Sequence, residues 1–168
     1  LNQLRKNDLK RYVVTVVTQV LVDENDKAFE DPNKPIGPFL TREEIAIREK
    51  ESGWKVREDT AGRGWRRLVA SPKPKRVIQR HMIRDAALAG HIVVACGGGG
   101  IPIKHEESGA YGGIEAVVDK DLTSAVLGAN IGAELLIILT AVPQVYLGFN
   151  TPDQKALSAV TLDEIENH

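Results

Sequence analysis

The sequence lacks most of the features that would place a protein outside the ordinary class of folded domains. One cysteine among 168 residues, Cys96, excludes an internal disulfide and any metal site built from several thiolates. The longest apolar run, residues 133–142, contains Glu134 and is far shorter than the roughly 20 residues of a membrane span. The basic first residues lack the apolar core of a secretory leader. We therefore expect a domain in a reducing, cytoplasmic compartment, without membrane contact.

The net charge of −1 conceals two stretches of opposite sign. Residues 55–84 contain ten Lys or Arg and two acidic residues, whereas residues 106–168 contain two basic and ten acidic residues. A basic stretch of this density can meet nucleic acid, phosphate groups or an acidic partner, or it can be a solvated face of the fold. No nucleic-acid-binding motif accompanies it, so we expect no nucleic-acid partner.

The first half of the chain indicates a strand followed by a polar excursion. The β-branched residues 12–22 are apolar on both faces and predict a buried strand of a parallel sheet. Residues 23–38 hold three prolines and predict a long loop. Thr41 and Glu44 form a capping box for a short helix that ends near Gly53. The predicted elements that complete the excursion, residues 30–75, are two alternating strands over 54–58 and 65–69.

The second half alternates between helices and strands. This order predicts an α/β fold with a largely parallel sheet. The predicted elements are a helix over 77–89 capped at Gly90, a buried strand over 91–96, a glycine loop over 97–100, a helix over 122–133, a buried strand over 135–139 and a last helix from the capping box of Thr161 and Glu164.

Four consecutive glycines, Gly97, Gly98, Gly99 and Gly100, follow a predicted strand at the edge where open α/β folds bind ligands. Without Cβ atoms their N–H groups can approach an anion closely and form a nest for phosphate or carboxylate. The run has neither the spacing of a P-loop nor the full dinucleotide fingerprint. The alternative is a tight turn that lets another segment pack closely.

A lysine between two acids precedes the predicted helix over 122–133. Lys120 can neutralise a transferring phosphoryl group, and Asp121 can hold that lysine in position. The alternative is a charged helix terminus capped by Asp121. Lys34, stiffened by flanking prolines, presents an ammonium group at a fixed place or is an ordinary surface lysine.

The other chemistry-bearing residues indicate no further site. The four histidines are scattered without the spacing of metal ligands, so we expect no metal site made by the protein. Cys96 ends an apolar strand, which favours a packed core residue over a nucleophile.

Eight stretches of the sequence together resemble the carbamate kinases, which belong to the amino-acid-kinase superfamily. The resemblance covers nearly the whole chain in the same order, which makes it far more specific than any single motif. The stretches are residues 17–26, 34–39, 58–67, 71–74, 97–102, 115–121, 138–140 and 152–156.

The resemblance implies an α/β fold, an αβα sandwich around a mostly parallel sheet. Residues 1–168 would form a single partial domain, with residues 30–75 as a small protruding, lid-like subdomain. It further implies a cytoplasmic homodimer that catalyses ATP + carbamate ⇌ ADP + carbamoyl phosphate, with Mg²⁺ accompanying the nucleotide. In arginine fermentation, the arginine deiminase pathway, the family runs this reaction in the ATP-forming direction.

The resemblance also implies roles for individual residues. Lys120 matches the lysine that stabilises the phosphoryl group, Asp121 the aspartate that organises the lysines, and Lys34 the lysine of the lid. Three groups of residues are thus implied, namely the catalytic Lys120, Asp121 and Lys34, the substrate-binding Gly97, Gly98, Gly99 and Gly100, and the nucleotide-binding Thr140, Ala141, Val142 and Tyr146.

The sequence departs from the family in three places. The N-terminal glycine–asparagine loop and the C-terminal glycine-rich segment with another active-site lysine have no counterpart. Residues 140–146 read TAVPQVY, where many members read TDVDGVY. Since the chain also starts at Leu1, we expect a truncated kinase that is inactive alone. The alternatives are a non-catalytic nucleotide-binding or assembly module and a related kinase that phosphorylates the carboxyl group of an amino acid.

Overall fold

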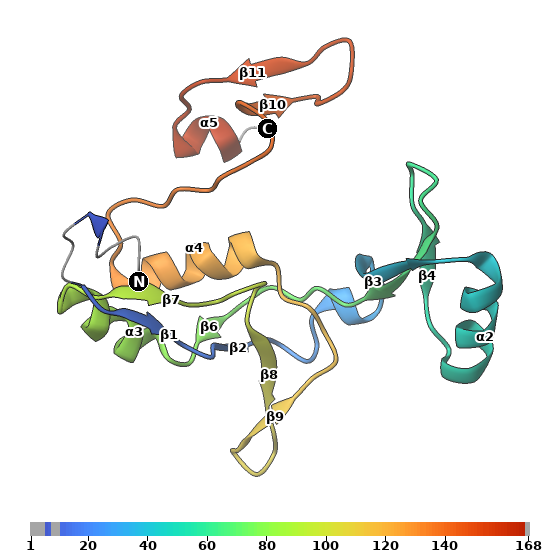
Figure 1. The fold of residues 1–168 in the computed structure, drawn as a ribbon, viewed down its shortest axis with the longest axis horizontal. Coiled ribbons are helices and arrows are strands. Elements are labelled where there is room, and N and C mark those ends of the chain that lie inside the picture. Colours follow the sequence, from blue (N-terminus) through green and yellow to red (C-terminus); the bar gives the residue numbers. More distant parts are fainter. Residues whose placement is uncertain (1–5, 8–10, 167–168) are drawn as a thin grey trace. The chain divides into compact units, whose positions relative to one another are not determined.

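The chain divides into two compact units, Leu1–Leu136 and Ile137–His168. The computed structural model describes residues 6–7 and 11–166 (Figure 1). No helix in this described part is long and apolar enough to cross a membrane. The first unit contains the glycine loop (residues 97–100).

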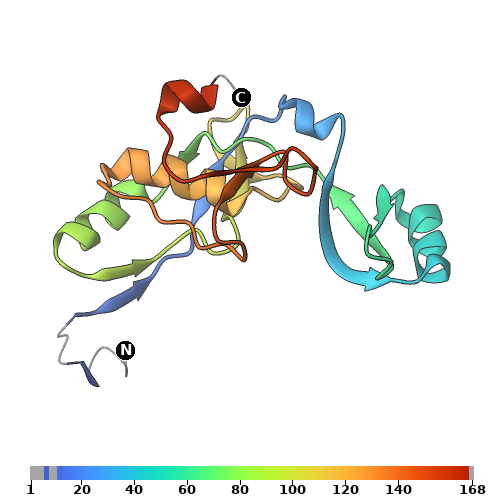
Figure 2. The same ribbon diagram turned by 90° about the horizontal axis from the view of Figure 1, so that it is seen from above.

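Two sheets of the first unit contain parallel strand pairs (Figures 1 and 2). In the larger one, β2 (Gln19–Leu21) pairs in parallel with β8 (Ile101–His105). Antiparallel neighbours complete it on both sides, β6 (Arg76–Val77) next to β2 and β9 (Tyr111–Gly113) next to β8. A separate parallel pair joins β1 (Val13–Thr15) to β7 (Ile92–Val94). The α/β class is thus confirmed, with parallel and antiparallel pairs mixed.

The single buried strand predicted over residues 12–22 is wrong in its extent. The segment divides into β1 and β2, because its partner is interrupted by the glycine loop: β1 pairs with β7 before the loop, and β2 pairs with β8 after it. The exposed fractions of Tyr12 and Val17 are 73% and 74%. Only the second part is buried on both faces.

Two helices cover this part of the fold and enclose its core. α3 (Arg80–Leu88) packs against β7 and against α4 (Lys120–Ile131), and α4 also packs against β6. The predicted end of α3 is confirmed, since Gly90 has φ +85° just beyond this helix. The core between sheet and helices is made by Val20, Val22, Val77, Ile83, Cys96, Val118 and Leu127. The predicted packing of Cys96 in a core is therefore confirmed.

A hairpin lies where the predicted order passes directly from the glycine loop to a helix. The chain continues from Gly100 into β8 and returns through β9 before α4 begins. The strand order predicted from alternating helices and strands missed this pair, because residues 101–113 contain Pro102 and three glycines and carry little apolar periodicity.

The excursion forms a small antiparallel sheet of its own, ordered β3-β5-β4. It contains β3 (Lys34–Leu40), α2 (Arg42–Ser52), β4 (Val56–Glu58) and β5 (Trp65–Val69). The predicted capping box of Thr41 and Glu44 and the predicted helix end at Gly53 are confirmed. So is the hairpin. Its role as a lid stays a prediction.

The long loop predicted over residues 23–38 is wrong in part. A short 3-10 helix, η1 (Lys27–Phe29), lies within it, and β3 begins at Lys34. The two prolines of β3 are tolerated because β3 is an edge strand of the small sheet, where a missing N–H donor leaves no neighbour unpaired.

The second unit contains the antiparallel pair β10 (Val145–Leu147) and β11 (Lys155–Leu157) and the short helix α5 (Leu162–Glu166). The predicted capping box is present, since the Glu164 carboxylate accepts from the Thr161 N–H at 2.6 Å. The buried strand predicted over residues 135–139 is wrong. These residues are in no strand, and their exposed fractions lie between 47% and 91%. No described strand pairs with them, so their backbone makes no hydrogen bonds of the kind that join the strands of a sheet.

Candidate functional site

The glycine loop combines both interpretations of its sequence. A Cβ on Gly99 would lie 2.0 Å from the carbonyl oxygen of Val118, and one on Gly100 would lie 2.5 Å from Cγ2 of Val20. Close packing therefore requires glycine at these two positions. Gly97 and Gly98 are exposed, and a Cβ on either would meet nothing within 4 Å. The loop is thus packed at one end and open at the other.

Two backbone donors of the loop are unused. Gly97 N–H donates to Ala95 and Gly99 N–H donates to Cys96, at 2.9 and 2.7 Å. The N–H groups of Gly98 and Gly100 have no acceptor among the residues that the structure describes. Unpaired N–H groups on side-chain-free backbone suit the oxygens of an anion.

Asp119, rather than Asp121, caps the helix that follows. Its Oδ1 accepts from the N–H groups of Asp121 at 2.9 Å and Leu122 at 3.3 Å. The alternative that made Asp121 the cap is therefore wrong. The extended backbone of Asp119, with φ −71° and ψ 130°, places its side chain over the first turn of α4, as an N-cap requires.

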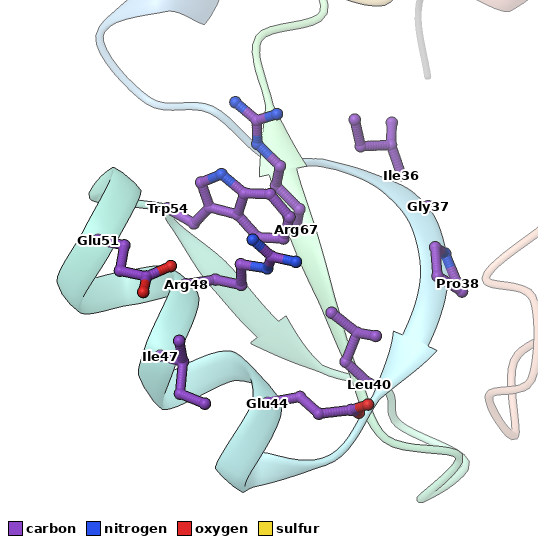
Figure 3. Close-up of a pocket in the computed structure, with 10 residues that line it drawn as sticks. All are labelled: Ile36, Gly37, Pro38, Leu40, Glu44, Ile47, Arg48, Glu51, Trp54 and Arg67. Atoms are coloured by element: carbon purple, nitrogen blue, oxygen red, sulfur yellow. The ribbon is translucent and has the colours of Figure 1, made fainter.

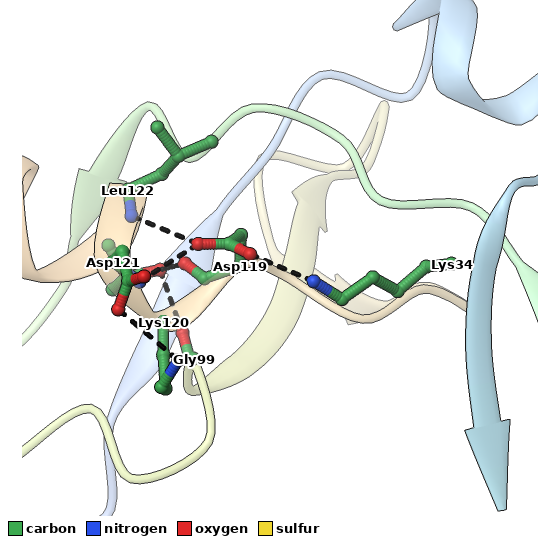
Figure 4. A network of polar contacts seen from close by, with 7 residues as sticks. Lys34, Gly99, Asp119, Lys120, Asp121 and Leu122 are labelled. Carbon is green, nitrogen blue, oxygen red and sulfur yellow. Dashed lines mark hydrogen bonds and ion pairs between the residues drawn. The ribbon is translucent and has the colours of Figure 1, made fainter. Parts of the chain in front are cut away.

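Lys34 reaches this helix terminus from the small sheet, 85 residues away in the chain. Its Nζ donates to Oδ2 of Asp119 at 2.8 Å (Figure 4). This hydrogen bond is the main reason that the pKa of Asp119 lies below its usual value, and the two N–H donors of α4 lower it further. The carboxylate is therefore ionised and holds the ammonium group beside α4.

Lys120 and Asp121 lie at the start of α4 with their side chains largely in solvent. The Lys120 Nζ is 3.3 Å from Oδ1 of Asp121. The exposed fractions of the two side chains are 65% and 47%, so the pair is weak and the ammonium group is free to move to a stronger anion. The structure thus brings Lys34, Lys120 and Asp121 to one helix terminus, whereas their catalytic roles remain predictions.

Thr123 was missed by the sequence reasoning. It is fully buried, and its Oγ1 lies 3.0 Å from the carbonyl oxygen of Gly99 and 2.9 Å from that of Asp119. The hydroxyl therefore links the glycine loop to the helix terminus. Asp119 was also missed as the partner of Lys34. Its position directly before the helix was the available signal for a cap, but no sequence signal pairs it with Lys34.

Several charges of the basic stretch form ion pairs within the fold. Arg67 pairs with Glu115 and so links the small sheet to the segment before α4. Arg63 bonds Asp59 through two nitrogens and lowers the pKa of that carboxyl to about 2. Lys75 pairs with Asp23 at 2.7 Å. These contacts favour the structural interpretation of the basic stretch.

A cavity of about 540 Å³ lies between α2 and the small sheet (Figure 3). The Trp54 ring contacts two guanidinium groups there, with Arg67 at 4.8 Å and Arg48 at 5.8 Å from its centre. Glu44 and Glu51 add charge to the helical wall. None of the predicted site residues lines this cavity.

The four predicted nucleotide-binding residues lie in the second unit. The Thr140 hydroxyl donates to the carbonyl of Val142 at 2.6 Å, and Tyr146 lies in β10 with its ring 5.7 Å from that of Phe149. Ala141 lies between Thr140 and Val142 in an exposed bend. Their position relative to the glycine loop therefore stays a prediction.

The described side chains form no cluster of metal ligands. Within residues 6–7 and 11–166, no three His, Cys, Asp or Glu side chains gather as ligands. Asp119 already accepts three hydrogen bonds, and Asp121 faces Lys120. The start of α4 thus carries two ammonium groups, those of Lys34 and Lys120, beside the carboxylates of Asp119 and Asp121.

Comparison with known proteins gives a consistent result. The amino acid kinase family model matches residues 3–168. The carbamate kinase of Clostridium perfringens is 46% identical over 166 residues, 99% of this chain and 52% of its own length. That of Thermococcus kodakarensis is 46% identical over 168 residues, 100% of this chain and 53% of its own length. The chain thus spans about half the length of these curated relatives.

Two solved structures are similar to this chain along most of its length. A crystal structure from Aeropyrum pernix K1 is similar with a TM-score of 0.88 and 38% identity, over 99% of this chain and 53% of the other. The carbamate kinase of Giardia lamblia bound to AMP-PNP is similar with a TM-score of 0.77 and 37% identity, over 93% of this chain and 49% of that protein.

Proposed function

The chain belongs to the amino acid kinase family, and we propose that it is the phosphoryl-binding part of a carbamate kinase. The observation that carries this proposal is the 46% identity to curated carbamate kinases along the whole chain. The meeting of Lys34, the glycine loop and Lys120 at one helix terminus supports it, because phosphoryl transfer depends mainly on positioning and on neutralising charge.

The proposed reaction transfers a phosphoryl group between carbamoyl phosphate and ADP. In the ATP-forming direction, the bond between phosphorus and the carbamate oxygen breaks as an oxygen of the ADP β-phosphate bonds to phosphorus, and carbamate leaves. The unused N–H groups of Gly98 and Gly100 bind the phosphoryl oxygens. Lys120 neutralises the charge that they carry in the transition state, and Asp121 keeps that lysine near the helix terminus.

Lys34 completes this arrangement from the small sheet. Without substrate its ammonium group is paired with Asp119. We infer that it turns toward the carbamoyl phosphate when this dianion is bound, because a doubly charged phosphate attracts an ammonium group more strongly than a single carboxylate does. Residues 30–75 would in this way act as a lid over the substrate.

The nucleotide and its metal are assigned less directly. The Giardia lamblia relative binds AMP-PNP, which supports ATP and ADP as ligands here, with Thr140, Ala141, Val142 and Tyr146 as the proposed contacts. The described side chains form no cluster of three or more metal ligands, and Mg²⁺ in phosphoryl-transfer sites takes only one or two protein carboxylates beside the substrate phosphates. Mg²⁺ would therefore enter with the nucleotide phosphates rather than on ligands of this chain.

Three further properties of the whole protein are part of the proposal. It would work as a cytoplasmic homodimer, it would serve arginine fermentation in the ATP-forming direction, and this chain by itself would be inactive. The last expectation follows from its length, since the chain covers only 52% and 53% of two relatives.

The test is an ATP-formation assay with carbamoyl phosphate and ADP. We expect no turnover from this chain alone, and turnover once the remaining half of a relative is joined to it. Turnover by the chain alone would contradict its inactivity and support the kinase. A completed protein that phosphorylates ADP from an amino-acid acyl phosphate but not from carbamoyl phosphate would favour the related amino acid kinase. A completed, folded protein that binds ADP without turnover would favour the non-catalytic module.

A further inference from the structure

Two buried threonines bind the glycine loop at three places. Thr18 and Thr123 are the buried polar residues of the described chain, with exposed fractions of 4% and 0%. Burying a hydroxyl group destabilises the fold unless the group makes hydrogen bonds. Both make them with the loop or with the residues next to it.

Thr18 holds the two ends of the loop. Its Oγ1 accepts from the N–H of Cys96 at 2.9 Å, directly before the first glycine. Its main-chain oxygen accepts from the N–H of Ile101 at 2.8 Å, directly after the last. Cys96, directly before the loop, has φ +65°. Residues with a side chain rarely adopt this backbone angle, so surrounding contacts must enforce it.

Thr123 holds the middle of the loop against α4. Its single hydroxyl proton faces two carbonyl oxygens, those of Gly99 and Asp119. Gly99 is pressed against Val118 so closely that no Cβ fits between them. The hydroxyl therefore lies where the loop carrying the unused N–H groups meets the turn that carries Lys120.

We propose that Thr123 is a positioning residue that holds the glycine loop and Lys120 at the separation that phosphoryl oxygens require. This inference rests on the proposed function. The side chain touches neither ligand nor reacting atoms, and it acts through the backbone of Gly99 and Asp119. Without the hydroxyl, no hydrogen bond would hold Gly99 to α4, and an anion bound between the loop and the helix terminus would be held less closely by one set of donors.

The experiment compares Thr123→Val with Thr123→Ser in this chain. Inorganic phosphate is titrated while the amide signals of Gly98, Gly100 and Lys120 are followed by NMR. Valine keeps the shape but removes the hydrogen bond, whereas serine keeps the hydrogen bond. We expect phosphate affinity at least about tenfold weaker in Thr123→Val and within about threefold of wild type in Thr123→Ser.

Ser124→Ala is the matched control. Ser124 lies next to Thr123 in α4, and its hydroxyl also donates to a backbone carbonyl, that of Lys120 at 2.7 Å. This hydrogen bond does not reach the loop, so phosphate affinity should stay unchanged. Weakening by Ser124→Ala as large as that by Thr123→Val would overturn the proposal, because helix stability alone would then explain both.

The remaining outcomes separate this inference from the proposed function. Wild-type phosphate affinity in Thr123→Val overturns the positioning role even if the completed protein makes ATP. If Thr123→Val does not fold, weak binding by the folded Thr123→Ser variant contradicts the proposal, and wild-type binding supports it. Inactivity of the completed protein, combined with the expected phosphate series, overturns only carbamate kinase activity. Wild-type loop amides that do not respond to phosphate overturn both.

Discussion

The start of α4 and the apolar run over residues 135–139 lie close in the chain but differ in what surrounds them. At the start of α4, Val118 and Thr123 are 1% and 0% exposed, and β3 and the glycine loop both reach it. In the apolar run, Leu135 and Leu139 are 74% and 91% exposed. Hydrophobic sequence alone therefore does not bury a segment, because burial needs a second element to cover it.

The same contrast holds for polar groups. Around α4, charges and hydroxyls from distant parts of the chain meet, such as Lys34 with Asp119. Near the apolar run, the hydroxyl of Thr140 finds its partner two residues away, at Val142. Long-range polar contacts fix geometry that local ones leave open, so a preorganised anion site is expected only in the first region.

The largest effect is expected from removing the Lys120 ammonium group at the start of α4. Lys120→Ala should lower turnover about 100- to 1,000-fold in the completed kinase, with little change in nucleotide affinity, because the ammonium group acts mainly on the transition-state charge. Steady-state ATP formation from carbamoyl phosphate measures it. Lys50→Ala, at an exposed position on α2, serves as the control. Near-normal turnover of the Lys120 variant would remove this residue from the mechanism.

A second prediction tests the close packing of the glycine loop against Val118. Gly99→Ala should destabilise the first unit by about 2–3 kcal/mol, since its Cβ would lie 2.0 Å from the Val118 oxygen and its φ is +131°. Urea unfolding is the measurement. Gly97→Ala has open space at φ +45° and should cost about 1 kcal/mol. Equal losses for both variants would mean that the loop does not press on Val118.

A third prediction concerns the charge that joins β3 to α4. Asp119→Asn should cost about 1 kcal/mol at pH 7, because the amide keeps a capping oxygen but loses the ion pair with Lys34, which solvent partly screens. Since the pKa of Asp119 is lowered, its contribution is complete above the ordinary value of 3.8 and falls as the pH drops through its folded pKa.

The pH dependence of unfolding by urea tests this directly. The difference in unfolding free energy between wild type and Asp119→Asn should shrink below pH 3.8. A difference that grows toward acid pH would contradict the assigned ion pair.

The smallest effect is expected in the apolar run. Leu139→Ser should change the unfolding free energy by less than about 0.5 kcal/mol, since the side chain is 91% exposed. Val118→Ala, at 1% exposure, should cost about 2 kcal/mol. A loss above about 1 kcal/mol for the leucine variant would show that another surface covers the run in solution.

Local sequence signals predicted the local structure well. The capping boxes at Thr41 and Thr161, the helix end at Gly53 and the hairpin of β4 and β5 depend on residues only a few positions apart. Such contacts are favoured by the short sequence itself, because most of their energy comes from neighbouring residues rather than from distant parts of the chain.

Predictions that depended on distant partners were less accurate. The strand over residues 12–22 is divided because its neighbours β7 and β8 are separated by the glycine loop. The strand over residues 135–139 did not form, because hydrophobicity predicts burial but supplies no neighbouring strand. The alternative that places the cap of α4 at Asp121 is wrong by two residues, because the cap is Asp119 and periodicity cannot resolve so small a shift.

By itself, the sequence determined the α/β class, the candidate residues of the anion site and the resemblance to carbamate kinases, since all three depend on residue types and their order. Only the tertiary structure decided that Lys34 pairs with Asp119 and that Thr123 links the helix to Gly99. These pairs join positions 85 and 24 residues apart. Closing such distances is possible only because the buried apolar core offsets the loss of chain entropy.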